Sequence, residues 1–346
     1  GYICLGSCYY QHDFAPRAHV DEYGLLEGCK VISRCVRGSS REDSGYSRTY
    51  QSGQDSDGRE IVRYPHGRRR AASVFKLIDV GLGCGDQSLY LTRRLHRSTN
   101  TGSDNGNVRD TTAKDQELVP LFNSYIGINI TPAQVNLARH RLKAASENKS
   151  TSPTVWTSDV KIFAADAARP ASWDQTLNEA IFGTGSPQST PDTSTAPLSA
   201  KEHTWLLGLD TLYHFRPSRV PLFECAYRDM NASIMGFDLL LGDSLSLWGN
   251  LRLRLICLAA GIPYANLMTV KEYENMLTSV GYAHENIKLE DVSHHTFAGV
   301  AEFLRAKEAE LNKYGMTMGR LKMPGKVFDW WAKSGAVKGY VIVAHR

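Results

Sequence analysis

The chain has 346 residues, of which 42% are apolar and 22% are charged, and its formal net charge is +4. This length and composition suffice for one large α/β core, and no apolar run reaches the roughly 18 residues of a membrane-spanning helix. The charge is too small to require a nucleic-acid partner. Seven cysteines, an odd number without a C-x-x-C pair, favour a reducing cytoplasmic location over a disulfide framework.

The first 73 residues show no sustained helical or strand period, and residues 37–70 are rich in Arg, Ser, Gly and Asp. We expect an irregular segment there, disordered or left incomplete by a truncated gene model. Its cysteines and His12 match no zinc pattern, so no metal site is predicted. A single domain is expected over residues 74–346.

A glycine-rich turn follows the first predicted strand. The stretch 75–89, FKLIDVGLGCGDQSL, is an apolar strand that ends in Asp79 and continues into Gly81, Gly83 and Gly85 before a helix. Glycines at alternate positions let the backbone turn sharply and approach a ligand closely. The third glycine falls one residue early for the G-x-G-x-x-G pattern of dinucleotide enzymes, which disfavours nicotinamide. The turn predicts a cofactor site, with a purely structural turn as the alternative.

Two further strand-helix units follow in the sequence. Residues 124–130 predict a second buried strand, and a helix over 131–142 has Thr131 as N-cap and Pro132 at its first position. A third apolar strand over 160–165 ends at Asp166. Ligands of open α/β sheets bind at the carboxyl ends of the strands, so these ends are expected to meet at the same site.

The fourth predicted strand, from Trp205, ends in Asp210 and is followed by Tyr213 and His214. Because the unperturbed pKa of histidine lies near neutral, His214 is a candidate to deprotonate an acceptor, and Tyr213 a candidate to orient it. Packing of the two rings under the next helix, with Asp210 as a simple cap, is the alternative.

A helix is predicted within residues 245–268, where Trp248, Leu251, Leu255 and Leu258 recur at helical spacing. It is expected to cover the substrate, to belong to the core or to join a second copy. Arg252 and Arg254 argue against a membrane span.

The remaining elements predicted from the pattern are a helix over 269–281 with a capping box, a strand over 287–292, a long helix over 296–314 and a last strand over 339–346. His294 and His295 could line an acceptor pocket, but ordinary surface histidines are the favoured interpretation. Residues 98–116, 146–159 and 183–200 are polar and are expected to be loop insertions.

The segments LIDVGLGCGDQSLYL, GINITPAQVNLAR and FAADA resemble the first three motifs of the class I S-adenosylmethionine-dependent methyltransferases, and the likeness runs from about Val74 to the C-terminus. The second motif is similar to that of small-molecule enzymes related to the tocopherol, sarcosine and cyclopropane-fatty-acid methyltransferases. The resemblance implies a doubly wound seven-stranded α/β sheet, mostly parallel with an antiparallel last strand.

The resemblance also implies S-adenosylmethionine as cofactor and a small organic acceptor methylated on N, O or C. The positions that it assigns to the cofactor are Asp79, Gly81, Gly83 and Gly85 beside the aminoacyl part, Asn129 at the ribose, and Asp166 and Ala167 at the adenine. Ile130 and Gln134 are also expected to contact the cofactor. At Asn129 most of the superfamily has an acid, and an amide still donates to and accepts from a diol. Tyr213, His214 and Asp210 would face the acceptor.

Three other functions remain open at this point. They are methylation of RNA or protein, lipid alkylation of the cyclopropane-synthase type, and cofactor binding without catalysis. The expected assembly is a monomer or a homodimer without stable membrane insertion.

Overall fold

The computed structural model describes residues 52–54, 60–62, 74–93, 95–97, 118–147, 157, 159–183, 202–243, 245–319 and 322–346. The irregular segment predicted for residues 1–73 lies outside these residues, apart from the short strands β1 (Ser52–Gln54) and β2 (Glu60–Val62). Most of the three predicted loop insertions also lie outside them.

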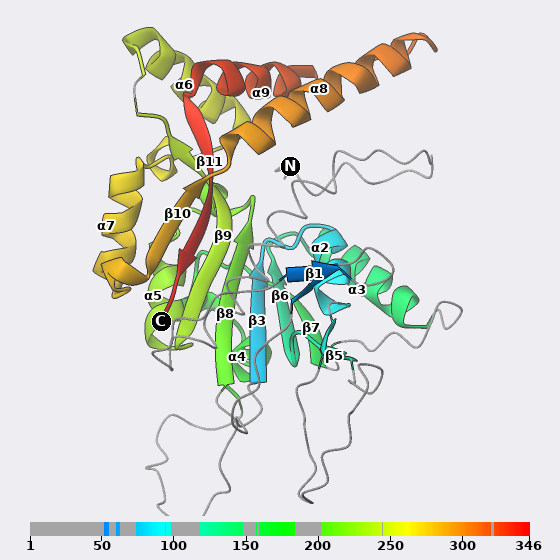
Figure 1. Ribbon diagram of the computed structural model, residues 1–346, viewed down its shortest axis with the longest axis vertical. Helices are drawn as coiled ribbons and strands as arrows, with labels where there is room; N and C mark the ends of the chain where they lie inside the picture. Colours follow the sequence, from blue (N-terminus) through cyan, green and yellow to red (C-terminus); the bar gives the residue numbers. More distant parts are fainter. Residues whose placement is uncertain are drawn as a thin grey trace, which may run out of the picture.

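A seven-stranded sheet in the order β10-β11-β9-β8-β3-β6-β7 forms the centre of the described part of the chain (Figure 1). Its strands are β3 (Val74–Val80), β6 (Ser124–Asn129), β7 (Asp159–Ala164), β8 (Glu202–Leu209), β9 (Ala232–Leu241), β10 (Ile287–Asp291) and β11 (Val337–Ala344). β11 runs antiparallel to both of its neighbours, and the pairs from β9 to β7 are parallel. The predicted fold class is confirmed.

Helices connect the strands. They are α2 (Asp86–Thr92), α3 (Pro132–Glu147), α4 (Gln175–Phe182), α5 (Val220–Arg228), α6 (Leu247–Ala260), α7 (Val270–Val280), α8 (Ser293–Asn312) and α9 (Lys322–Ser334), with short 3-10 turns that include η2 (Leu212–His214) and η3 (Tyr264–Asn266). A small hairpin pairs β4 (Leu95–Arg97) with β5 (Leu118–Pro120).

The predicted helix ends agree with the structure to different degrees. The capping box of α7 is present, with Thr269 and Glu272 bonded reciprocally and Gly281 at the C-cap. α3 continues five residues beyond the predicted end, and α8 begins three residues before its predicted start. α9 was not predicted, because Pro324 and Gly325 lie in its first turn and interrupt the apolar period.

Strand alternation sends side chains of β3 to both faces of the sheet, and both faces are covered. Ile78 and Val80 pack with residues of α4, α5 and α7, whereas Leu77 packs with Leu91 of α2 on the other face. A smaller cluster places α3 beside the glycine loop, through Leu82 and its neighbours. The near-continuous burial of β3 explains why its sequence reads as an apolar run.

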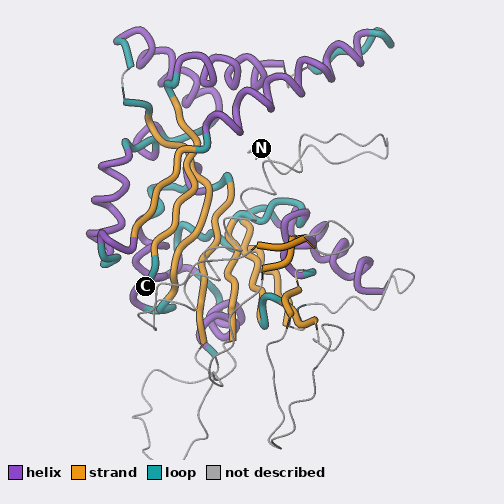
Figure 2. Tube along the Cα trace, in the orientation of Figure 1, coloured by secondary structure: helices purple, strands orange, loops and turns teal. Residues whose placement is uncertain are grey.

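The carboxyl ends of β3, β6, β7, β8 and β9 share one edge of the sheet, because these strands are parallel. α6 follows β9 at this edge, α9 leads into the antiparallel β11, and α8 follows β10. The three helices therefore stand beyond the carboxyl edge, at the top in Figure 1 and in the tube view of Figure 2.

Candidate active site

The three glycines after β3 adopt backbone conformations that favour glycine. Their φ angles are +77° at Gly81, +59° at Gly83 and +88° at Gly85. The loop is pinned to the second strand by a hydrogen bond from the Gly81 amide to the Ile128 carbonyl oxygen at 2.8 Å. The predicted sharp turn is confirmed.

Two glycines also allow close approach by neighbouring elements. A Cβ at Gly81 would lie 2.3 Å from the Thr211 hydroxyl oxygen, and one at Gly85 would lie 2.7 Å from the Cβ of Ala138. Both distances are too short for real atoms, so these glycines bring the segment after β8 and helix α3 against the loop. The glycine loop and the start of η2 therefore touch directly.

Asp79 lies beneath the loop and is fully buried. Its carboxylate accepts hydrogen bonds from the Tyr125 hydroxyl and, at 2.6 Å, from Gln87 Nε2 at the start of α2. Burial raises the pKa of Asp79 to about 6, and the two hydrogen bonds oppose that rise. The side chain thus ties β3, β6 and α2 together. Its predicted contact with the aminoacyl part of a cofactor stays a prediction.

At the end of β6, Asn129 and Gln134 form a pair. Asn129 Nδ2 donates to Gln134 Oε1 at 2.9 Å, and Asn129 is almost completely buried. The exposed side chain between them in sequence, Ile130, has 59% of its surface accessible. This hydrogen bond orients the Asn129 amide and does not involve its Oδ1 atom. It also brings together two of the residues predicted to bind the cofactor, Asn129 and Gln134.

Asp166 and Ala167 follow β7 at the same edge. Asp166 Oδ1 accepts from the Ala168 amide at 3.0 Å, and the Asp166 carbonyl accepts from Trp173 Nε1 at 2.9 Å. The Ala165 amide donates to the Asn129 carbonyl at 3.1 Å. This bond holds the ends of the second and third strands side by side, so the predicted ribose and adenine positions are adjacent.

A salt bridge that sequence reasoning missed braces the loop from α3. Arg141 Nη1 lies 2.9 Å from Asp86 Oδ2 and donates to the Cys84 carbonyl at 3.2 Å. The arginine is one of many charged residues in its helix, and no local pattern distinguishes it. It fixes the end of the glycine loop relative to α3.

The candidate catalytic residues lie immediately after β8. The Tyr213 hydroxyl donates to Asp210 Oδ1 at 2.7 Å, and Asp210 has a left-handed φ of +55°. The rings of Tyr213 and His214 are 4.3 Å apart. Thr211, between Asp210 and these rings, is the residue that touches Gly81. The structure therefore brings all three predicted catalytic residues next to the glycine loop.

The pKa of His214 differs from the near-neutral value of an unperturbed histidine. Burial, together with the positive charge of Arg216, lowers the pKa of His214 to about 4. The imidazole is therefore neutral at physiological pH, the form that accepts a proton.

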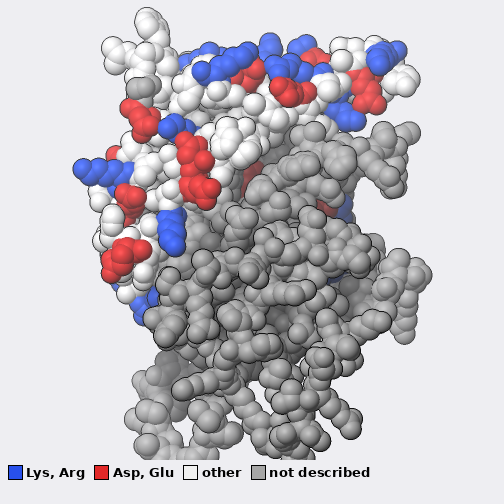
Figure 3. Space-filling view, viewed as in Figure 1, with Lys and Arg blue, Asp and Glu red and all other residues white. Residues whose placement is uncertain are grey.

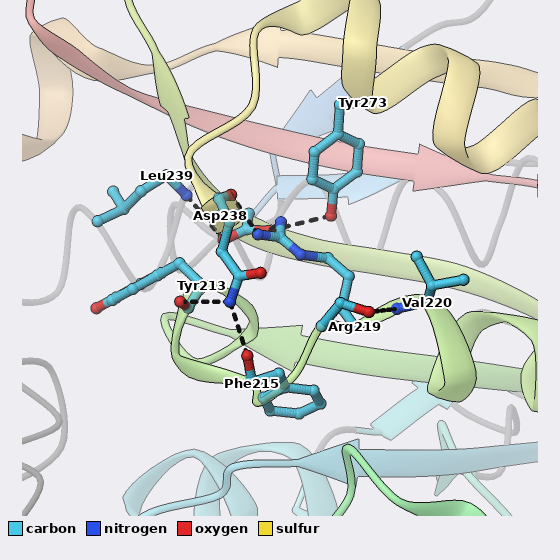
Figure 4. A network of polar contacts seen from close by, with 9 residues as sticks. Tyr213, Phe215, Arg219, Val220, Asp238, Leu239 and Tyr273 are labelled. Carbon is cyan, nitrogen blue, oxygen red and sulfur yellow. Dashed lines mark hydrogen bonds and ion pairs between the residues drawn. The ribbon is translucent and has the colours of Figure 1, made fainter. Parts of the chain in front are cut away.

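A buried polar network holds the segment that carries Tyr213 and His214 in place (Figure 4). Asn266 Nδ2 donates to the Tyr213 carbonyl at 3.0 Å and to the Phe215 carbonyl at 2.7 Å. The Asn266 carbonyl in turn accepts from the Arg219 guanidinium, which also pairs with Asp238. The network links η2 to η3, α5 and β9.

The Arg219 and Asp238 side chains are fully buried. The Tyr273 hydroxyl donates to Asp238 at 3.1 Å, and the Leu239 amide donates at 2.9 Å. Burial raises the pKa of Asp238, and the Arg219 charge acts against that rise. Sequence reasoning missed this network because its members are far apart in the chain and only the fold joins them.

The structure also decides the interpretation of two other stretches: it excludes the core alternative for the apolar stripe of α6 and shows His294 and His295 to be surface histidines, as favoured. Trp248, Leu251, Leu255 and Leu258, considered for the core, are 49% to 80% exposed; the buried residues of α6 are Leu253 and Cys257, which share a cluster with Tyr213. The helical period of the stripe alone does not say which side of the helix is covered. His294 and His295 lie exposed in the first turn of α8, with rings 3.7 Å apart.

Within the described ranges, no group of three or more His, Cys, Asp or Glu side chains is placed to hold a metal ion. Over the same residues, no helix is long and apolar enough to cross a bilayer.

Comparisons with known proteins give structural likeness only. No protein-family model matches the chain, and no curated protein matches it in sequence. Among solved structures, it is similar to phosphoethanolamine N-methyltransferase 2 from Haemonchus contortus, in complex with phosphomonomethylethanolamine and S-adenosylhomocysteine. That likeness has a TM-score of 0.49 and 10% identity and covers 79% of this chain and 49% of the other. The chain thus spans about half the length of that enzyme.

Two other similar structures are the cyclopropane synthase MmaA2 from Mycobacterium tuberculosis and a putative sarcosine dimethylglycine methyltransferase from Galdieria sulphuraria. The TM-score is 0.47 and the identity 11% in both cases, with coverage of 79% and 80% of this chain and 79% and 78% of the respective structures. At this level the likenesses carry no argument about activity. The strand order and the antiparallel β11 give the chain the doubly wound, mostly parallel seven-stranded α/β sheet that its sequence predicts.

Proposed function

We propose that the chain transfers a methyl group from S-adenosylmethionine to a small organic acceptor, giving S-adenosylhomocysteine. One observation carries the proposal: the glycine loop touches Thr211, between Asp210 and the Tyr213–His214 pair, and therefore adjoins the candidate acceptor side. A methyl donor and its acceptor must meet in this way, because the transfer is an in-line displacement that depends on positioning.

The residues present fit the cofactor. The left-handed glycines 81, 83 and 85 turn the chain sharply at the carboxyl edge, where the aminoacyl part would lie. Because Thr211 and Ala138 fill the space beside Gly81 and Gly85, we assign the close approach of the cofactor to Gly83. We assign the ribose hydroxyls to Asn129, oriented by Gln134 and flanked by Ile130, and the adenine to Asp166 and Ala167. We propose that Asp79 holds the loop in position through its hydrogen bonds to Tyr125 and Gln87, in place of the direct cofactor contact that the sequence predicts.

When bound, the cofactor would supply a methyl group already activated by the sulfonium. The chain's own residues would then orient the acceptor and accept its proton. The imidazole of His214 is neutral at physiological pH and can accept a hydrogen bond or a proton from an N–H or O–H acceptor, but its pKa of about 4 makes it a weak base. The Tyr213 hydroxyl, held by Asp210, is suited to orient the acceptor. The surrounding burial limits access of water.

We place this activity in the cytoplasm, in a monomer or homodimer. Cys225 and Cys257, which are buried and form no disulfide in the described part of the chain, support a reducing location. Burial raises the pKa of Cys225 to about 12, helped by Asp229, and that of Cys257 to about 11. Both thiols are therefore protonated and unreactive at neutral pH.

Calorimetric titration of the full chain with S-adenosylhomocysteine tests the proposal without knowledge of the acceptor. Micromolar binding is expected for the wild type, and loss of binding for Gly83→Val. The control is Gly315→Val, since Gly315 has a similar φ of +69° in open space after α8. Binding that survives Gly83→Val would refute the placement of the loop. Binding without turnover over a broad acceptor screen would favour a cofactor-binding protein without catalysis.

A further inference from the structure

Helix α6 exposes an apolar stripe along one side. Leu247, Trp248, Leu251, Leu255 and Leu258 are 90%, 80%, 49%, 59% and 80% exposed, and their spacing places them on one helical face. Leu253 and Cys257, on the opposite face, are buried against α9. Of the eleven large hydrophobic side chains that are exposed in the described residues, these five lie on a single helix of fourteen residues. A stripe of this kind marks an interaction surface.

The charge around the stripe is positive. The basic residues of α6 and α9 are Arg252, Arg254, Lys322, Lys326 and Lys333, and Asp329 is the one acidic residue of these two helices. Asp329 pairs with Lys333 at 2.6 Å and with Arg305 of α8 at 2.9 Å, and Lys322 pairs with Glu308 of α8 at 2.8 Å. The positive charge of this surface therefore comes mainly from Arg252 and Arg254 of α6. The net charge of the two helices, +4, equals that of the whole chain.

The two helices form one surface. The guanidinium of Arg252 lies 4.3 Å from the centre of the Trp330 ring of α9, and that of Arg254 lies 4.8 Å from the Tyr264 ring. Neither arginine makes an ion pair with a carboxylate of the described residues, so their charge is available to a partner. Figure 3 shows Lys and Arg side chains along the upper edge of the molecule, over α8 and α9, interspersed with Asp and Glu side chains.

The positive charge of α6 favours an anionic lipid surface over a second copy of the chain as the partner of the stripe. Two copies of the chain that paired their α6 stripes antiparallel would bring Arg252 and Arg254 of one helix near the same residues of the other. α6 offers no acid to neutralise them. An anionic lipid surface satisfies both features, because acyl chains take up the apolar side chains and the phosphates lie at the level of the arginines. Trp248 would lie at the level of the headgroups, where tryptophan is enriched.

We propose that α6 docks on the surface of an anionic lipid membrane, lying in its plane rather than crossing it. This inference goes beyond the proposed methyl transfer and does not depend on it. It has a consequence for the site, because a hollow of about 410 Å³ at the end of α6 is lined by Leu258, Ile262 and Arg216. Arg216 is two residues from His214, so a docked helix would hold the candidate acceptor side close to the lipid surface.

Co-sedimentation of the full chain with vesicles tests the proposal. We expect binding to phosphatidylcholine vesicles that contain phosphatidylserine, weakening at high salt, and no measurable binding to phosphatidylcholine alone. Arg252→Gln with Arg254→Gln is expected to weaken binding about tenfold or more. The matched control is Arg228→Gln, an exposed arginine of α5.

The apolar contribution is tested separately. Trp248→Gln with Leu251→Gln is expected to weaken binding about tenfold or more, whereas Phe182→Gln, which changes an exposed aromatic residue of α4, leaves it unchanged. Circular dichroism checks that each variant is folded. Failure of the wild type to bind anionic vesicles, or full binding by the Trp248 and Leu251 variant, would overturn the proposal. A dimer that this variant converts to monomer would assign the stripe to a second copy instead.

Discussion

The buried pair of Arg219 and Asp238 allows a quantitative test of how the acceptor side is held. Asp238→Asn removes the charge that compensates the guanidinium, while the new amide oxygen still serves the Tyr273 hydroxyl or the Leu239 amide. Because both charged side chains are fully buried, the guanidinium is left without a counter-charge. Breaking a pair of this kind costs about 3–5 kcal/mol.

The assay is urea unfolding at constant temperature, followed by circular dichroism. The matched control is Asp243→Asn, since Asp243 pairs with Lys338 at 2.9 Å with 77% of its side chain exposed. Surface pairs of that kind contribute at most about 1 kcal/mol. Replacing both buried partners, Arg219→Met with Asp238→Leu, is expected to recover most of the loss, because no charge is then left buried.

Two results would refute the reasoning. One is equal destabilisation by Asp238→Asn and Asp243→Asn. The other is a double variant as unstable as Asp238→Asn alone, which would show that the pair contributes shape and hydrogen bonds rather than charge compensation.

Three further predictions follow from the site. Gly85→Ala is expected to lower the unfolding free energy by about 1–3 kcal/mol, because the new Cβ meets Ala138 at 2.7 Å with φ at +88°, and urea unfolding should show no comparable loss for Gly315→Ala. The pKa of Asp79 is about 6 when folded, against 3.8 ordinarily, so the folded state binds the extra proton between these values. Stability should therefore fall by up to about 3 kcal/mol as pH rises from about 4 to 6, and Asp79→Asn should flatten that part of the profile; a slope unchanged in the variant would assign it to another group. His214→Ala is expected to lower turnover by about 10²-fold or more with S-adenosylhomocysteine affinity unchanged, and the wild-type rate should fall only as pH drops toward about 4; unchanged turnover would return His214 to a packing role.

Much of the sheet is predictable because its signals are local. β6 begins at the predicted residue and ends one residue before the predicted end. The ends of α7 follow from Thr269, Glu272 and Gly281, which act within one turn of the helix. The three glycines of the loop likewise indicate a left-handed backbone conformation, since other residues rarely adopt it.

The buried hydrogen bonds and ion pair that hold the candidate catalytic residues are not predictable in this way. Asn266 is 53 residues from Tyr213, whose carbonyl it contacts, and Arg219 is 19 residues from Asp238. The pKa of His214 depends on burial and on Arg216, and burial is a property of the assembled fold. The apolar stripe of α6 has the period of a core helix, and only the packing of α9 shows which face is covered.

The central claim is that the glycine loop, Asn129 and Asp166 form a single S-adenosylmethionine site. A crystal structure of the full chain with S-adenosylhomocysteine tests it most directly. The account predicts the aminoacyl part over glycines 81–85, the ribose hydroxyls at Asn129 and the adenine beside Asp166 and Ala167. The product bound elsewhere, or a loop left empty at saturating concentration, would contradict it.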